Sequence, residues 1–98
     1  MAELLDAAAV DAALGELDDW TGDPSGIRRT VELSSFPTAV AVVVEVAKAA
    51  EEMDHHPDID IRWRTLTFHC ATHSAGGVTG RDVVLARRID ALIAGRRQ

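Results

Sequence analysis

The chain has 98 residues, of which 47% are hydrophobic and 27% are charged. These values predict one small folded domain, residues 1–98, and argue against a disordered chain. The formal net charge is -6. A negative protein is repelled by the phosphate backbone of nucleic acids, so we expect no direct nucleic-acid partner. A core this small gains stability from burial in an oligomer, which makes a homo-oligomer the first expectation.

The compartment is predicted from three features. Cys70 is the only cysteine, which excludes an intrachain disulfide and suits a reducing compartment. The first six residues lack the basic region of a signal peptide, and the longest apolar run, residues 39–44, is too short to cross a bilayer. We therefore expect a cytoplasmic protein with no membrane partner.

The first third of the chain predicts a helix, a loop and a strand. Apolar residues at helical spacing predict a helix over residues 7–17, with Asp6 as its N-cap. Residues 20–26 are rich in glycine, proline and aspartate, and they predict a loop. Alternation over residues 27–33 predicts a half-buried strand. Its inward face would carry Ile27, Arg29, Val31 and Leu33.

A second helix is predicted from about residue 37 to residue 53. Ser34-Ser35-Phe36-Pro37 is typical of a helix start, because serine caps a helix and proline fits its first turn. Residues 40–46 are mostly β-branched and would also suit a strand, but the length of the segment favours a helix. Its predicted buried face is Phe36, Val40, Val43, Ala47 and Ala50.

The stretch 59–72 is rich in β-forming residues, and its alternation slips by one residue. Ile59 and Ile61 have odd numbers, whereas Leu66 and Phe68 have even numbers. Such a slip is expected from a tight turn or bulge near Arg64. The local sequence offers no glycine, asparagine or aspartate for that turn.

The last third predicts a loop over residues 74–77 and a final helix. Thr79 and Asp82 have the spacing of a capping box, and Gly95 is the expected stop of the helix. Its apolar stripe is Leu85, Ile89, Leu92 and Ile93. The order of helix, strand, helix, two strands and helix predicts an α+β fold, with the helices on one face of an antiparallel sheet.

All four histidines lie between residues 55 and 73. A straight strand over residues 59–72 would hold its ends roughly 45 Å apart, at about 3.3 Å per residue. A hairpin turning near Arg64 instead returns His73 to the side of His55 and His56. Histidines exchange protons near neutral pH, so the sequence predicts a proton-transfer cluster. Glu51, close to the end of the second helix, is placed to orient one imidazole.

The histidines also allow other interpretations. A His-His pair after acidic residues is often a solvated loop, and three converging histidines also suit zinc. No cysteine flanks them, and adjacent histidines seldom share one metal, so we predict no metal site. His69 is expected to be a surface or cross-strand residue. Cys70 is expected to be a small buried apolar residue.

The segment Glu51-x3-His55-His56-Pro57, followed by Trp63, Thr72-His73, Gly77, Thr79 and Asp82, resembles the bacterial type of the pterin-4a-carbinolamine dehydratase family. A first helix ending near Trp20, a strand and a helix led by Phe36 extend the resemblance over nearly the whole chain. The chain departs from animal members in having Ile59 for an aromatic residue, Trp63 for tyrosine, and Ala71 for a hydroxyl residue.

The resemblance implies a four-stranded antiparallel sheet with three helices packed on one face, in a homodimer or homotetramer. It implies a hydro-lyase that converts 4a-hydroxytetrahydrobiopterin to quinonoid dihydropterin and water in tetrahydrobiopterin recycling, without a cofactor. His55 and His73 would be the principal acid-base groups, and His56 would bind and orient the substrate. Glu51 would support a histidine without contacting the substrate. The implied substrate-binding positions are Asp54, His55, His56, Ala71, Thr72, His73 and Ser74.

Two alternatives to this activity remain. In the first, the chain is a non-catalytic dimerisation cofactor of a transcription factor and acts through helix surfaces. In the second, it binds a different pterin in molybdopterin metabolism. Three titrating groups in one place favour the enzyme, because a scaffold has no use for them.

Overall fold

A computed structural model describes residues 3–96 of the chain, and it confirms the α+β prediction. Three helices and a four-stranded antiparallel sheet make up the fold, and the strand order in the sheet is β1-β2-β4-β3. The elements are α1 (Ala7–Glu16), β1 (Thr21–Asp23), β2 (Gly26–Glu32), α2 (Phe36–Met53), β3 (Asp58–Arg62), β4 (Thr65–Cys70) and α3 (Gly80–Arg96).

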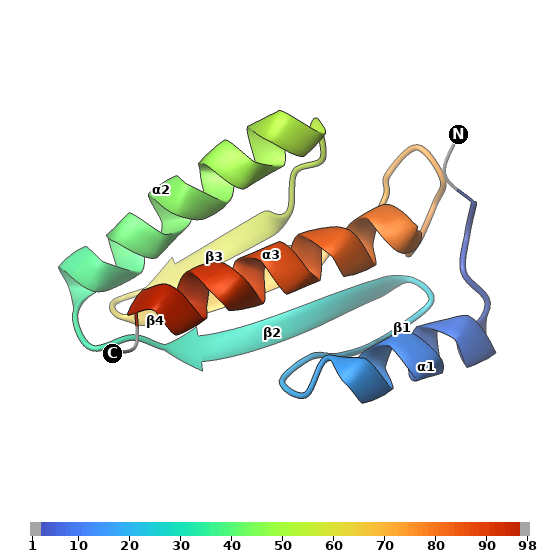
Figure 1. The fold of residues 1–98 in the computed structure, drawn as a ribbon, viewed down its shortest axis with the longest axis horizontal. Helices are drawn as coiled ribbons and strands as arrows, with labels where there is room; N and C mark the ends of the chain where they lie inside the picture. The colour runs from blue at the N-terminus through green and yellow to red at the C-terminus, as the bar shows by residue number, and fades with distance from the viewer. Residues whose placement is uncertain (1–2, 97–98) are drawn as a thin grey trace.

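The helices α2 and α3 lie side by side on one face of the sheet and run in opposite directions (Figure 1). The core lies between these helices and the inward side chains of β2 and β4, where Ile27, Leu66 and Phe68 are fully buried. None of the helices described in residues 3–96 is both long and apolar enough to cross a membrane. This arrangement brings the C-terminal end of α2 close to the N-terminal end of α3.

The predicted loop over residues 20–26 contains the edge strand β1, so that part of the prediction was wrong. Thr21 pairs with Arg28 and Asp23 pairs with Gly26, on either side of a turn at residues 24–25. All three residues of β1 are exposed. A three-residue edge strand without a buried face has no hydrophobic alternation, so backbone pairing alone defines it.

The strand β2 has the predicted inward face, including its charged residue. Arg29 is buried, and its Nη1 donates to Asp90 Oδ1 at 2.6 Å, while Nη2 lies 3.3 Å from Asp19 Oδ2. Trp20 Nε1 donates to the same Asp90 oxygen at 2.8 Å. A buried guanidinium is tolerated only when carboxylates compensate its lost hydration. These contacts fix β2 to α3 and to the segment before β1.

The helix α2 is confirmed, together with its N-cap Ser35, but its predicted buried face was only partly correct. The side chain of Ser35 accepts a hydrogen bond from the Thr38 amide. Phe36 is 49% exposed and Val40 is 39% exposed. Ala50 is buried as predicted, and the other residues that α2 buries are Ala39, Val42, Val46 and Ala49. Because the first half of α2 is apolar all round, its sequence does not select one face over another.

The predicted hairpin near Arg64 is confirmed. Trp63 and Arg64 form the two-residue turn between β3 and β4, and Arg62 pairs with Thr65. Ile59 lies opposite Phe68, so the odd-numbered and even-numbered apolar residues share one face of the sheet. Trp63 has a positive φ of 54°. The turn therefore forms without glycine, and an amide-to-carbonyl hydrogen bond from Leu33 to Arg64 at 2.8 Å holds it to the end of β2.

The helix α3 continues one residue beyond the predicted stop at Gly95, since Arg96 is still helical. The predicted stripe is otherwise correct, because Leu85, Ile89 and Ile93 are buried and Leu92 is partly buried. A glycine inside the last turn costs little when solvent can satisfy the final carbonyls.

Cys70 is buried, as predicted, and its thiol is expected to be unreactive in the folded protein. Burial raises the pKa of the Cys70 thiol to about 12. Folding therefore removes the thiolate, which is the reactive form, at neutral and mildly alkaline pH. At pH 8 a thiol-specific reagent should label Cys70 only in denaturant, as measured by intact-mass spectrometry. Rapid labelling of the native protein would contradict this account.

Candidate functional site

The turn that carries His55 and His56 is fixed by the end of α2. Asp54 adopts the left-handed conformation, with φ 49° and ψ 46°. The amide of Asp54 donates to Glu51 O at 3.2 Å, and the amide of His55 donates to Ala50 O at 3.0 Å. This pair of bonds is a Schellman motif, which ends a helix and turns the chain sharply away from its axis. It places both histidines beyond the last turn of α2.

His73 lies in a loop that follows β4 and returns to the start of α3. Thr72 and Gly77 pair across the base of this loop, where the Thr72 amide donates to Gly77 O at 2.8 Å. The Val78 amide donates to Pro24 O at 2.8 Å, which ties the loop to the turn between β1 and β2. A Cβ at position 77 would lie 2.5 Å from Pro24 O. Only glycine allows this close backbone approach.

These two segments enclose a pocket of about 270 Å³. It contains all three histidines of the predicted cluster, because the β3-β4 hairpin returns the chain to the end of α2. The lining residues are Asp54, His55, His56, Ala71, Thr72, His73, Ser74 and Arg81. Each substrate-binding position implied by the resemblance is thus part of one pocket. Arg81 is the additional member.

The imidazole of His55 is held by a buried carboxylate. His55 Nε2 lies 2.6 Å from Asp82 Oδ1, and Asp82 is fully buried at 0% exposure. The second oxygen of Asp82 accepts hydrogen bonds from Thr72 Oγ1 at 2.8 Å and from the Thr79 amide at 2.9 Å. Both carboxylate oxygens are therefore hydrogen-bonded, which fixes the carboxylate and with it the orientation of the His55 ring.

The other two histidines are far more accessible to solvent than His55. The side chain of His56 is 54% exposed, and its Nε2 contacts Glu51 Oε2. This contact with Glu51, in the last turn of α2, therefore orients the His56 ring. His73 is exposed. The pocket combines one buried imidazole with two that solvent can reach, and such a set can remove a proton at one point and supply one at another.

Two residues of this site were not predicted as site residues. Asp82 was identified as a capping residue and as part of the motif that resembles the family, but not as a contact of His55; its bond to the Thr79 amide confirms the capping role. A capping carboxylate points back over the N-terminal turn of its helix, and that direction was the signal available for its contact with the pocket. Arg81 is exposed and donates from Nη2 to Met53 O and Asp54 O. No pattern in the sequence indicated this contact.

The other candidate residues lie elsewhere. His69 is a cross-strand residue, as predicted; its Nδ1 is 3.7 Å from Asp58 Oδ2, and it does not line the pocket. Trp63 is 70% exposed at the β3-β4 turn, and it is not among the lining residues. Within residues 3–96, no three His, Cys, Asp or Glu side chains are grouped closely enough to hold a metal ion.

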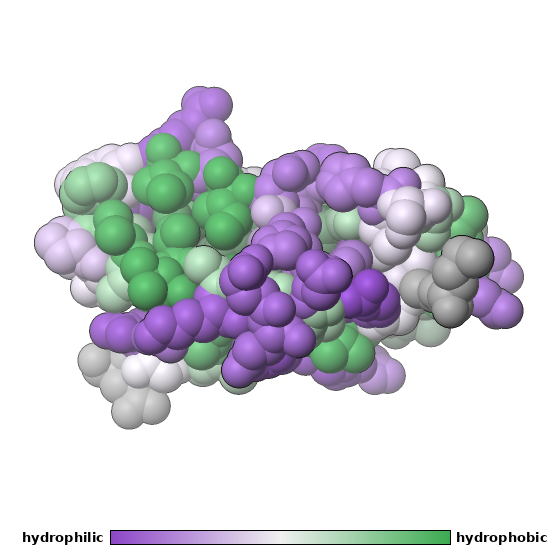
Figure 2. Space-filling view, turned by 90° about the horizontal axis from the view of Figure 1, so that it is seen from above, coloured by the Kyte–Doolittle hydropathy of each residue, from purple (hydrophilic) through white to green (hydrophobic). Residues whose placement is uncertain are grey.

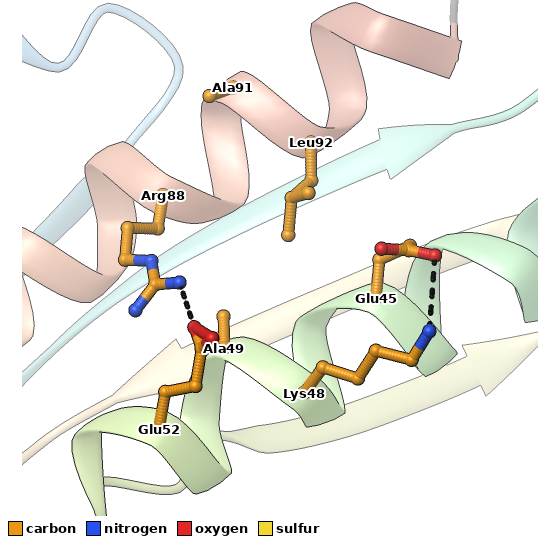
Figure 3. A pocket seen from close by; sticks show the side chains of 7 residues that line it. All are labelled: Glu45, Lys48, Ala49, Glu52, Arg88, Ala91 and Leu92. Carbon is orange, nitrogen blue, oxygen red and sulfur yellow. Dashed lines mark hydrogen bonds and ion pairs between the residues drawn. The ribbon is translucent and has the colours of Figure 1, made fainter.

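A larger groove of about 360 Å³ lies between α2 and α3. Figure 3 shows that an ion pair between Arg88 of α3 and Glu52 of α2 bridges it, while Lys48 and Glu45 form a second ion pair, at 3.8 Å, along α2. Its lining includes no histidine. Its charged groups are half-buried or exposed and already paired, so the histidine pocket remains the better candidate for acid-base chemistry.

The sequence matches the family model described as pterin 4 alpha carbinolamine dehydratase over residues 3–92. A relative from Nocardia farcinica, provisionally named pterin-4-alpha-carbinolamine dehydratase, is 59% identical and aligns over 92% of this chain and 95% of its own length. A relative from Roseiflexus castenholzii with the same provisional name is 53% identical, over 95% of this chain and all of its own.

Two solved structures have a similar fold. A transcriptional coactivator/pterin dehydratase from Brucella melitensis superposes with a TM-score of 0.87 at 32% identity, covering 91% of this chain and 97% of its own. A pterin dehydratase-like RuBisCO assembly factor of the alpha-carboxysome superposes with a TM-score of 0.62 at 21% identity, over 76% and 86% of the two chains. The second match supports the fold alone.

Proposed function

The chain belongs to the pterin-4a-carbinolamine dehydratase family, and on this premise we propose that it is a 4a-hydroxytetrahydrobiopterin dehydratase. In the reaction the C4a–O bond breaks and N5 loses its proton. Water and quinonoid dihydropterin are the products. We assign the enzyme to tetrahydrobiopterin recycling in the cytoplasm. No redox change occurs, so acid-base groups suffice and no cofactor is required.

The observation that carries this proposal is the buried contact between His55 and Asp82 at 2.6 Å, inside the pocket that also holds His56 and His73. An ionised carboxylate only accepts hydrogen bonds, so His55 Nε2 donates to it and Nδ1 is the basic nitrogen. A carboxylate behind an imidazole also stabilises the imidazolium that forms when the ring takes a proton. His55 is therefore suited to the role of general base.

In the proposed mechanism, His55 removes the proton from N5 while His73 protonates the departing hydroxyl group. Hydroxide is a poor leaving group, and its protonation allows it to depart as water. His73 is exposed, so solvent restores its proton after each turnover. His56, oriented by Glu51, binds the pterin at the open side of the pocket. Asp54 and Ser74 offer polar side chains to the edge of the ring, and Thr72 lines the pocket while its hydroxyl holds Asp82.

The activity is tested with 4a-hydroxytetrahydropterin generated in situ and followed by its ultraviolet absorbance. Catalytic amounts of the protein should accelerate its conversion to quinonoid dihydropterin well above the rate in buffer. A decay rate equal to that in buffer, with folded protein, would contradict the proposal.

We further propose that the protein acts as a homodimer or homotetramer. Phe36, Val40 and Val44 recur at every fourth position on the outer face of α2, and each is exposed. Figure 2 shows this hydrophobic area on the left of the view, over the N-terminal half of α2. Contiguous apolar surface of this kind is typical of a protein interface. Ile61 and Trp63 are exposed as well.

The substitution Val44→Glu is expected to shift the protein to smaller species, because it places a charge on that face. Sedimentation velocity at several concentrations measures the change. Val84→Glu is the matched control, since Val84 is equally exposed but lies on α3. Equal dissociation of both variants, or of neither, would argue against an interface at α2.

The same face of α2 would also serve the alternative role, a dimerisation cofactor of a transcription factor. That role predicts partner binding that survives loss of His55 and His73. Turnover of a different pterin by an intact pocket would instead favour a role in molybdopterin metabolism.

A further inference from the structure

We propose that Arg81 is a positioning residue, which holds the turn carrying His55 and His56 in its left-handed conformation. This inference rests on the proposed function for its effect on turnover, but its effect on the turn itself does not require any activity. Arg81 contacts the backbone of the turn, whereas Asp82 contacts the ring of His55.

The strained point of the turn is Asp54. Its φ of 49° and ψ of 46° lie in the left-handed region, which glycine adopts freely and which aspartate, like asparagine, adopts only occasionally and at a conformational cost. The two backbone bonds that define the direction of His55 form only if Asp54 keeps this conformation: Asp54 N–H to Glu51 O and His55 N–H to Ala50 O. A contact from outside the turn that favours this conformation would therefore stabilise both bonds.

Arg81 supplies that support from the first turn of α3. Its Nη2 donates to Met53 O and, at 3.3 Å, to Asp54 O, which are the carbonyls on either side of Asp54. Carbonyls at the end of a helix have no partner in that helix and lie at its negative end, so a guanidinium is favoured there. Arg81 also lines the histidine pocket, so its contact lies directly beside the site.

The neighbouring residues Arg81 and Asp82 thus hold the same turn at two points. Arg81 fixes the backbone before His55, and Asp82 fixes the imidazole. Without the first contact, Asp82 would still hold the ring, but the backbone would be free to leave the left-handed conformation. His56, which has no buried partner, would then lose its fixed position relative to His55.

The first test is amide hydrogen exchange, measured by NMR without any substrate. Arg81→Ala should accelerate exchange of the His55 amide about tenfold, because its bond to Ala50 O opens more often. Arg81→Lys should give a smaller change, since an ammonium group retains the charge. Arg88→Ala is the matched control: Arg88 lies on the same helix but contacts the Glu52 side chain rather than backbone. Unchanged exchange of His55 in Arg81→Ala would overturn the proposal.

The second test is a double-mutant cycle on turnover. Arg81→Ala should lower kcat about tenfold, because small misplacements of catalytic groups are costly. Glycine adopts the left-handed conformation without strain, so in the Asp54→Gly background the same change should cost less than about threefold. An equal loss in both backgrounds would show that Arg81 acts elsewhere, and would overturn the proposal. If the wild-type protein has no dehydratase activity, the proposed function fails while the exchange experiment still decides the role of Arg81.

Discussion

Replacing both His55 and His73 with alanine is expected to reduce the catalysed rate of 4a-hydroxytetrahydropterin dehydration by at least about a thousandfold. General acid-base catalysis by one side chain contributes roughly 10²–10⁴-fold. The two histidines line one pocket and differ in burial, which suits one base and one acid. Each single variant should therefore lose a large part of the activity. The measurement is the initial rate at saturating pterin.

The control for this prediction is His69→Ala. His69 belongs to the same short segment of sequence, but it lies on β4 and outside the pocket. Its removal should leave the rate within about twofold of wild type, because a surface substitution is usually near neutral. If His69→Ala were as damaging as the double variant, the loss would reflect folding and would count against a specific role of the pocket histidines.

Loss of the Asp82 carboxylate is expected to affect stability and turnover together. In Asp82→Ala the buried Thr79 amide and Thr72 hydroxyl lose their acceptor, and the His55 ring loses its partner. Leaving such groups unpaired should lower the free energy of unfolding by about 3 kcal/mol. Asp82→Asn keeps the shape but offers an amide group to His55, which disturbs the tautomer, so turnover should fall about a hundredfold.

Stability and turnover are separated by Asp90→Asn. Asp90 lies on the same helix and accepts hydrogen bonds from Arg29 and Trp20, but it does not line the histidine pocket. This variant should also unfold at lower urea concentration, yet its kcat should match that of the wild-type protein. Full turnover by folded Asp82→Asn would contradict the role assigned to the His55–Asp82 contact.

Local patterns were sufficient to predict the helices, β2 and the β3-β4 hairpin. The phase slip between Ile61 and Leu66 located the turn, although Trp63 and Arg64 are not typical turn residues. The convergence of the three histidines followed from that single inference. It succeeded because side-chain alternation in a strand has a fixed period, so a slip must be absorbed somewhere.

Features that depend on contacts between residues far apart in the sequence could not be predicted from local patterns. The strand β1 exists through backbone pairing with β2 alone. The outer face of α2 carries Phe36 and Val40, which are as apolar as the residues it buries, so only packing against the sheet selects the inner face. His55 and Asp82 are 27 positions apart. No periodicity links residues at that separation, and the fold is needed to bring them together.

The central claim is that the histidine pocket performs acid-base catalysis on a pterin, and chemical rescue tests it most directly. His73 lines the pocket and is exposed to solvent. The substitution His73→Ala therefore leaves a space that a small molecule such as imidazole can reach from solvent. Added imidazole should restore turnover of 4a-hydroxytetrahydropterin in this variant, and substituted imidazoles should do so in proportion to their acid strength. A variant that still binds pterin but gains no rate from any imidazole would contradict the claim.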